Sequence, residues 1–169
     1  MKRIRSAIFT AAAAACLGGC FNHDVNVHLD PQTPVEISAS GSSGSGSVQV
    51  SPGDAGHDYS SNKDKIDSST LKTLNISISP FPDNVATMLE TVVITFSDGS
   101  SQAEFQASNI AISAGNQSIP VPSDAAAFLT SVLKSGQTFT ATAEVTVDHG
   151  PVHVNVYLLM DISLSISLL

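Results

Sequence analysis

The stretch that decides the fold is VHVNVYLLMDISLSISL, residues 152–168, in which apolar and polar side chains alternate. One face is entirely apolar: Val152, Val154, Val156, Leu158, Met160, Ile162, Leu164, Ile166 and Leu168. The other is mostly polar: His153, Asn155, Tyr157, Leu159, Asp161, Ser163, Ser165 and Ser167. Because neighbouring side chains of a β-strand point to opposite faces, this period of two predicts a strand with one face in a core.

The length of this run predicts an irregularity. Seventeen residues at about 3.3 Å per residue would span roughly 55 Å, well beyond the roughly 30 Å width expected for a domain of this size. Both faces turn apolar at residues 158–161. We therefore expect a bend or bulge there, which could let the strand serve two sheets.

Shorter strand patterns separated by turn residues precede this run. Strands are predicted at 69–79, 90–96, 102–107 and 138–147, with turns at 97–100, 114–117 and 148–151. One short helix is predicted over 125–134, with Ser123 or Asp124 as its N-cap and Gly136 in a left-handed C-terminal position. This order of elements predicts a mostly β domain, an antiparallel β-sandwich of Ig-like or Greek-key type, over residues 65–169.

The chain from residue 20 to 64 has a different composition. It is polar, contains three prolines and includes the run SGSSGSGS at residues 40–47. A segment with so little apolar area cannot offset the entropy of ordering it, so we expect a disordered, flexible tether with a reach of roughly 35 Å. Two short alternating patches, 25–29 and 48–50, could each add an edge strand.

The N-terminus has the three parts of an export signal: basic Lys2, Arg3 and Arg5, an apolar run over 7–17, and small residues before Cys20. Leu17-Gly18-Gly19-Cys20 resembles the lipobox of bacterial lipoproteins. The resemblance implies that residues 1–19 are a lipoprotein signal peptide and that Cys20 is lipidated. The lipid chains would then anchor the protein to a membrane.

The resemblance also implies an address. Phe21 stands where inner-membrane lipoproteins of enteric bacteria carry Asp, which favours the outer membrane within the cell envelope. Ala13-Ala14-Ala15 also fits ordinary signal peptidase, whose product would keep Cys16 and Cys20. An uncleaved anchor is disfavoured because residues 4–19 are fewer than the roughly 20 that span a bilayer.

The charge of the chain excludes one class of partner. The full chain has 7 basic and 15 acidic residues, a net charge of −8. Loss of residues 1–19 removes three basic residues and no acidic one, which leaves a net charge of −11. A chain this acidic repels phosphate backbones, so nucleic-acid binding is not expected.

No residue pattern in the chain indicates catalysis or a cofactor. The motifs GxSxG, HExxH, GxGxxG and the Walker loop do not occur. His149 and His153 could approach Asp148 or Asp161, and His23, Asp24 and His28 form a second loose group. Each group offers too few convergent ligands, and the acidic residues 54, 58, 64 and 67 lack the spacing of a calcium loop, so no metal is expected.

Three functions fit these observations. The first is a lipid-anchored, non-enzymatic module for binding or assembly at the cell envelope, with an envelope protein as its partner. The second is a carrier of an apolar ligand between the sheets, which requires an internal cavity of a few hundred Å³. The third is a hydrolase whose site the sequence does not reveal.

Overall fold

The computed structural model describes residues 22–113 and 115–167. In chain order the elements are β1 (Asn22–Leu29), β2 (Val35–Ala39), β3 (Ser43–Val50), η1 (Pro52–Ala55), α1 (Gly56–Asn62), η2 (Lys63–Lys65), β4 (Ile66–Pro80), β5 (Met88–Ser97), β6 (Gln102–Ala111), β7 (Gln117–Ile119), α2 (Ala125–Ser135), β8 (Phe139–Val147) and β9 (Val152–Ser167).

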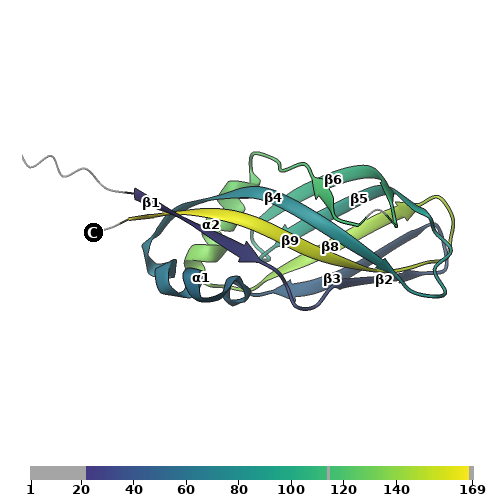
Figure 1. Cartoon of the computed structure of the whole chain (residues 1–169), viewed down its shortest axis with the longest axis horizontal. Coiled ribbons are helices and arrows are strands. Elements are labelled where there is room, and N and C mark those ends of the chain that lie inside the picture. Colours follow the sequence, from purple (N-terminus) through teal and green to yellow (C-terminus); the bar gives the residue numbers. More distant parts are fainter. Residues whose placement is uncertain (1–21, 114, 168–169) are drawn as a thin grey trace, which may run out of the picture.

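The strands form two antiparallel sheets that pack face to face (Figure 1). Sheet A has the order β1-β9-β4-β7, with β2 also paired to β9, and sheet B has the order β3-β8-β5-β6. The chain passes from one sheet to the other at each step from β2 to β5 and at each step from β6 to β9. The predicted antiparallel sandwich is confirmed, and this strand order is the winding of a jelly roll.

Strand β9 lies inside sheet A and is paired along both of its edges. On one side it meets β4 over most of its length, and on the other it meets β1 at residues 160–167 and β2 at residues 152–156. The predicted inward face is buried from Val152 to Ile166, whereas Leu168 lies outside the described residues. The predicted strand with one buried face is therefore confirmed, and its interior position in sheet A is a finding of the structure.

The predicted bulge in β9 and its passage between two sheets are wrong. Strand β9 stays in sheet A, and its pairing with β1 and with β2 shows no shift in register. The irregularities are in β4, where Asp67 and Lys72 are each an extra residue in the pairing with β9. The sandwich is elongated along β4 and β9 (Figure 1), so it accommodates one long strand.

The predicted flexible tether over 20–64 is wrong for residues 22–64. This segment supplies β1, β2, β3 and α1, and it buries Val27, Leu29, Val35, Ile37 and Val50. In β3 the glycines alternate with outward-facing serines, so Gly44 and Gly46 point inward. An added Cβ would lie 2.8 Å from Ile37 Cγ2 at Gly44 and 2.0 Å from the Glu36 carbonyl oxygen at Gly46. The Gly/Ser run is therefore a strand in which glycine permits close packing against β2.

The space between the sheets is filled by apolar side chains, among them a group of phenylalanines. The ring of Phe96 lies 4.8 Å from Phe105 and 5.3 Å from Phe139, measured between centroids, and Phe128 of α2 meets Phe139 edge-on at 5.6 Å. The predicted helix is confirmed as α2, which ends at Gly136 with a φ of 68°. The Asp124 side chain precedes α2 but makes no capping hydrogen bond.

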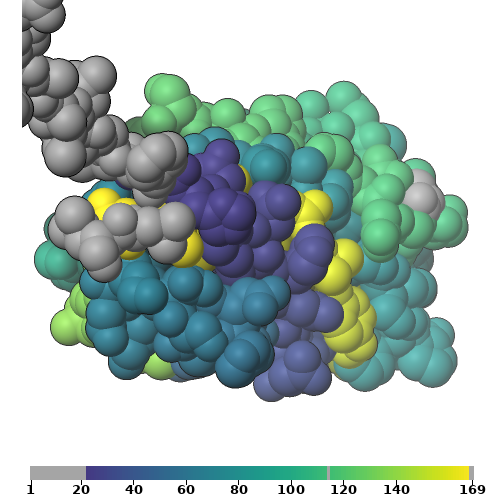
Figure 2. Space-filling model, turned by 60° about the vertical axis from the view of Figure 1, so that its left-hand side comes forward, coloured from purple at the N-terminus to yellow at the C-terminus, as the bar shows by residue number. Residues whose placement is uncertain are grey.

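Polar contacts attach α2 to the sandwich and α1 to α2. Thr130 Oγ1 of α2 accepts a hydrogen bond from the Ser69 backbone N–H of β4 at 2.9 Å. The Tyr59 hydroxyl of α1, a helix that the sequence did not predict, donates to the Leu133 carbonyl of α2 at 2.9 Å. Both helices lie at the end of the sandwich where β1 begins and β9 finishes, which we call the proximal end (Figures 1 and 2).

The register of β9 is tested by two neighbouring substitutions. Ile162→Ala should lower the free energy of unfolding by about 2–4 kcal/mol, because it leaves a cavity in the core. Ser163→Ala, on the outer face between Asn26 and Thr70, should change it by less than about 0.5 kcal/mol. Urea unfolding measures both values. Equal losses would contradict the assignment of faces.

The structural role of the Gly/Ser run is tested at two glycines. Gly46→Ala should destabilise the protein by about 1–3 kcal/mol or more, because the new methyl group overlaps the Glu36 backbone. Gly41→Ala is the matched control, since nothing lies within 4 Å of its added Cβ. Its free energy of unfolding, measured in urea, should stay within about 0.5 kcal/mol of the wild-type value. A flexible run would instead tolerate both substitutions equally.

Candidate functional site

The end of the sandwich opposite the proximal end gathers three connecting segments, and we call it the distal end. These segments are the β4–β5 loop (81–87), the β8–β9 turn (148–151) and the β2–β3 turn (40–42). The Ser42 carbonyl accepts a hydrogen bond from the Val147 N–H at 2.8 Å, and the Val85 N–H donates to the Pro151 carbonyl at 3.1 Å. The three segments are therefore joined to one another.

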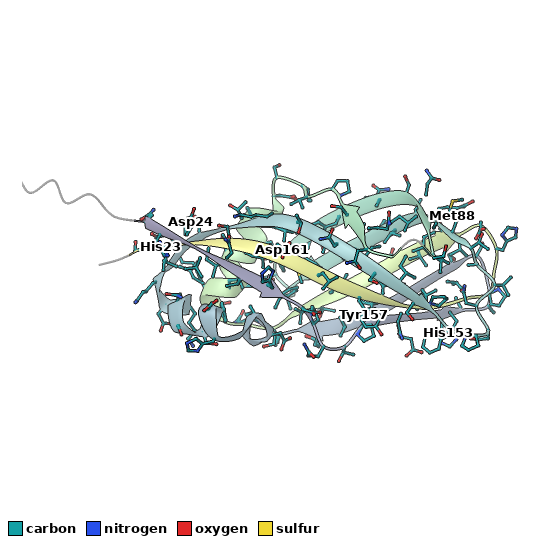
Figure 3. All side chains as sticks on the ribbon, in the orientation of Figure 1. His23, Asp24, Met88, His153, Tyr157 and Asp161 are labelled. Atoms are coloured by element: carbon teal, nitrogen blue, oxygen red, sulfur yellow. The ribbon has the colours of Figure 1, made fainter. Side chains whose placement is uncertain are left out.

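His153, at the start of β9, is the centre of the polar contacts on this end (Figure 3). Its Nδ1 lies 2.8 Å from Asp83 Oδ1 of the β4–β5 loop, and its Nε2 lies 3.4 Å from Glu36 Oε1 of β2. The imidazole stacks on Phe81 with the ring centroids 3.8 Å apart. His153 thus connects the loop to both β2 and β9.

Asp148 holds the other side of the β4–β5 loop. Its carboxylate accepts hydrogen bonds from the Thr87 hydroxyl and, at 3.1 Å each, from the backbone N–H groups of Thr87 and Met88. These donors, with the Thr87 hydroxyl as the largest contributor, hold the pKa of Asp148 well below its ordinary range. Asp148 therefore remains a carboxylate at neutral pH and fixes the start of β5.

A pocket of about 290 Å³ opens beside this loop, and we call it the distal pocket. It is lined by Pro80, Phe81, Asn84, Ala86, Thr87, Ile112 and Ser113. Val85, next to the pocket on the same loop, is 54% exposed, which is unusual for a large apolar side chain in this protein. An apolar pocket with a few polar groups and an exposed valine beside it suits the insertion of an apolar group from a partner.

The structure separates the residues that the sequence suggested as metal ligands. His149 Nδ1 contacts Asp148 Oδ2 at 3.0 Å, whereas His153 contacts Asp83 and Glu36 instead. Asp161 lies nearer the middle of β9 (Figure 3), where it accepts hydrogen bonds from Thr73 Oγ1 at 2.7 Å and contacts His28 Nδ1. Within residues 22–113 and 115–167, no three His, Cys, Asp or Glu side chains are grouped as a metal site would require.

Sequence reasoning missed the distal contacts because they join residues far apart in the chain. Glu36 and Asp83 are separated from His153 by 117 and 70 positions. No local spacing indicates such a contact. Cys20, for which the lipobox resemblance predicts lipidation, lies outside the described residues, so its lipidation stays a prediction.

Neither of the two Ser/His/Asp fragments in the described residues forms a catalytic triad. Ser61 Oγ lies 3.3 Å from His57 Nε2 on α1, but the structure gives this exposed pair no carboxylate partner. The His28–Asp161 pair on sheet A could orient an imidazole, but none of the contacts described for His28 joins it to a serine hydroxyl. A nucleophile, its base and an orienting group must all be within hydrogen-bond reach, and neither fragment meets that condition.

The chain matches no protein-family model, and no curated protein is similar to it. Several solved structures are similar in outline. A chain in the structure of Desmodium yellow mottle tymovirus matches with a TM-score of 0.36 and 13% sequence identity, and the match covers 100% of this chain and 95% of that chain. A chain of Mud crab tombus-like virus matches with a TM-score of 0.37 and 11% identity, over 93% of this chain and 96% of that chain. A chain of Cocksfoot mottle virus matches with a TM-score of 0.36 and 14% identity, over 100% of this chain and 95% of that chain.

Within residues 22–113 and 115–167, no helix has both the length and the apolar character that crossing a bilayer requires.

The role of Asp148 predicts a dependence of stability on pH. Because its pKa is lowered on folding, its contribution is present above the ordinary carboxyl pKa of about 3.9 and is lost as the pH falls through the folded pKa. Asp148→Asn should lower the Tm at pH 7 and reduce the loss of Tm between pH 5 and pH 2. Asp124→Asn, at an exposed side chain without a capping bond, is the control and should follow the wild-type curve. Parallel curves for all three proteins would refute this role.

Proposed function

We propose that this protein is a lipid-anchored, non-enzymatic module of the cell envelope, and that its distal end binds an envelope partner. The observation that carries the proposal is the short distance in the chain between Cys20 and β1, which begins at Asn22. Two residues at full extension span only about 7 Å. A lipid on Cys20 would therefore hold the proximal end against the bilayer, in place of the roughly 35 Å reach expected of a tether.

This arrangement assigns different tasks to the two ends. Strand β9 has 16 residues, so the distal end can stand as far as roughly 50 Å from the membrane surface. Val85 and the distal pocket would then be presented away from the lipid. An exposed apolar side chain beside a pocket is a feature of protein-binding surfaces, which supports a partner at this end.

The carrier hypothesis has less support. The distal pocket opens at the end of the sandwich, and a second hollow of about 410 Å³ lies on the outer face of sheet B. Neither lies between the sheets, where the phenylalanine rings are in contact. The hydrolase hypothesis lacks a nucleophile with its base and orienting group in the described residues, which favours a binding or assembly role.

Lipidation is tested by Cys20→Ser. The wild-type protein should partition into the detergent phase and have the intact mass of an acylated chain that starts at Cys20. The variant should lose the acyl mass and accumulate as uncleaved or aqueous-phase material. An unmodified chain that starts at Cys16 would refute the anchor.

The partner surface is tested by Val85→Asp. This substitution should reduce by at least about tenfold the amount of the envelope protein that crosslinks to the distal end in intact cells, because a charge would have to be buried at the contact. Val121→Asp is the matched control at another exposed valine and should leave that crosslink unchanged. Equal crosslinking by wild type and Val85→Asp would place the partner elsewhere.

A further inference from the structure

The outer face of sheet B has an unusual composition. Four strands contribute 16 outward positions that form four cross-strand rows: Ser43, Thr146, Thr91 and Ser108; Ser45, Glu144, Val93 and Gln106; Ser47, Thr142, Thr95 and Glu104; and Gln49, Thr140, Ser97 and Gln102. Ten carry a hydroxyl and three carry an amide, whereas only Glu104 and Glu144 are charged. Two charged residues in 16 positions is close to the 13% charged share of the whole chain, so this face is distinguished by its hydroxyl groups and not by its charge.

The face is also hollowed. The hollow of about 410 Å³ is lined by Ser43, Gly44, Ser45, Thr91, Val93, Glu144, Val145 and Thr146. Its volume lies within the range of roughly 300–1,000 Å³ that is typical of ligand pockets. The inward glycines of β3 are required by the contact with β2, but no packing contact requires serine at the outward positions 43, 45 and 47.

The polar groups of the hollow are available to a ligand. Thr91 and Thr146 bond to each other through their hydroxyls, which leaves one free O–H donor between them and acceptor capacity on both. The Glu144 carboxylate and the Ser45 hydroxyl make no side-chain hydrogen bond or ion pair with any described residue. A carboxylate flanked by hydroxyls can accept hydrogen bonds from several hydroxyl groups of one ligand.

Charge decides which class of ligand fits. The four lysines of the described residues are Lys63, Lys65, Lys72 and Lys134, and they lie on η2, β4 and α2, none of them on sheet B. A face without cations gives no attraction to phosphate or carboxylate groups. Two carboxylates in 16 positions also give little attraction to a basic peptide, and the single outward valine offers too little apolar area for a protein interface.

From this geometry we infer that the outer face of sheet B binds a neutral glycan, with Glu144, Thr91, Thr146 and Ser45 contacting one sugar unit in the hollow. The hydroxyl groups of a sugar both donate and accept, as do those of serine and threonine, and Val93 provides an apolar surface for its C–H groups. The rows of Ser, Thr and Gln continue beyond the hollow, which suits a chain of sugars. This site depends on neither the lipid anchor nor the distal pocket.

The experiment is calorimetry on the full chain in a detergent without a sugar head group, with cellohexaose, maltohexaose and chitohexaose as probes. We expect at least one probe to bind with a Kd below about 1 mM. Thr146→Val should weaken that binding about three- to tenfold, and Glu144→Gln about tenfold, because the first removes one neutral hydrogen bond and the second a charged one. Ser118→Ala on the outer face of sheet A should have no effect.

Amide chemical shifts give a second measurement that does not depend on the variants. Probe addition should shift the amides of residues 43–45, 91–93 and 144–146, and leave those of residues 73–77 in sheet A unchanged. The inference is overturned if no hexasaccharide binds at about 10 mM, if Thr146→Val and Glu144→Gln bind as the wild type does, or if hexalysine binds more tightly than every glycan.

Discussion

The fold depends on the pairing of β9 along both of its edges. Strand β4 occupies one edge, and β1 and β2 together occupy the other, so the two ends of the described chain are joined in one sheet. A strand whose apolar face is buried along its whole length supplies much of the core, and its burial is favourable only when both edges have their hydrogen-bond partners. The N-terminal strands are therefore part of the domain, although little in their composition indicates it.

The sequence predicted the elements whose patterns are local. The alternation in β9 and β8, and in β4 from Leu74 to Ile78, places each side chain on a known face, because the period of a strand is fixed by its geometry. The helix α2 was predicted from good helix formers followed by Gly136. These features specified an antiparallel sandwich without any knowledge of strand order.

What the sequence did not reveal depends on long-range contacts. Gly44 and Gly46 resemble linker residues until the Ile37 side chain and the Glu36 backbone are seen to lie where their side chains would be. The placement of the bulge in β4 rather than β9, and the contacts of His153 with Asp83 and Glu36, likewise depend on tertiary structure. A Gly/Ser repeat followed by Val48-Gln49-Val50 does keep a period of two, and that alternation was the one available signal for β3.

The absence of a tether changes how the surfaces of the protein would be used. If Cys20 carries a lipid, as we propose, the domain would lie within about 7 Å of it and could not search a large volume, so a partner would have to reach the distal end or the outer face of sheet B. Hydrogen exchange measured residue by residue tests this account most directly. Strands β1 and β3 are edge strands, so only alternate amides of each form a hydrogen bond, those of β1 to β9 and those of β3 to β8. We predict that these bonded amides exchange as slowly as the amides of their partner strands. Exchange of residues 43–50 at the rate of an unfolded chain would contradict it, because the Gly/Ser run would then be a linker.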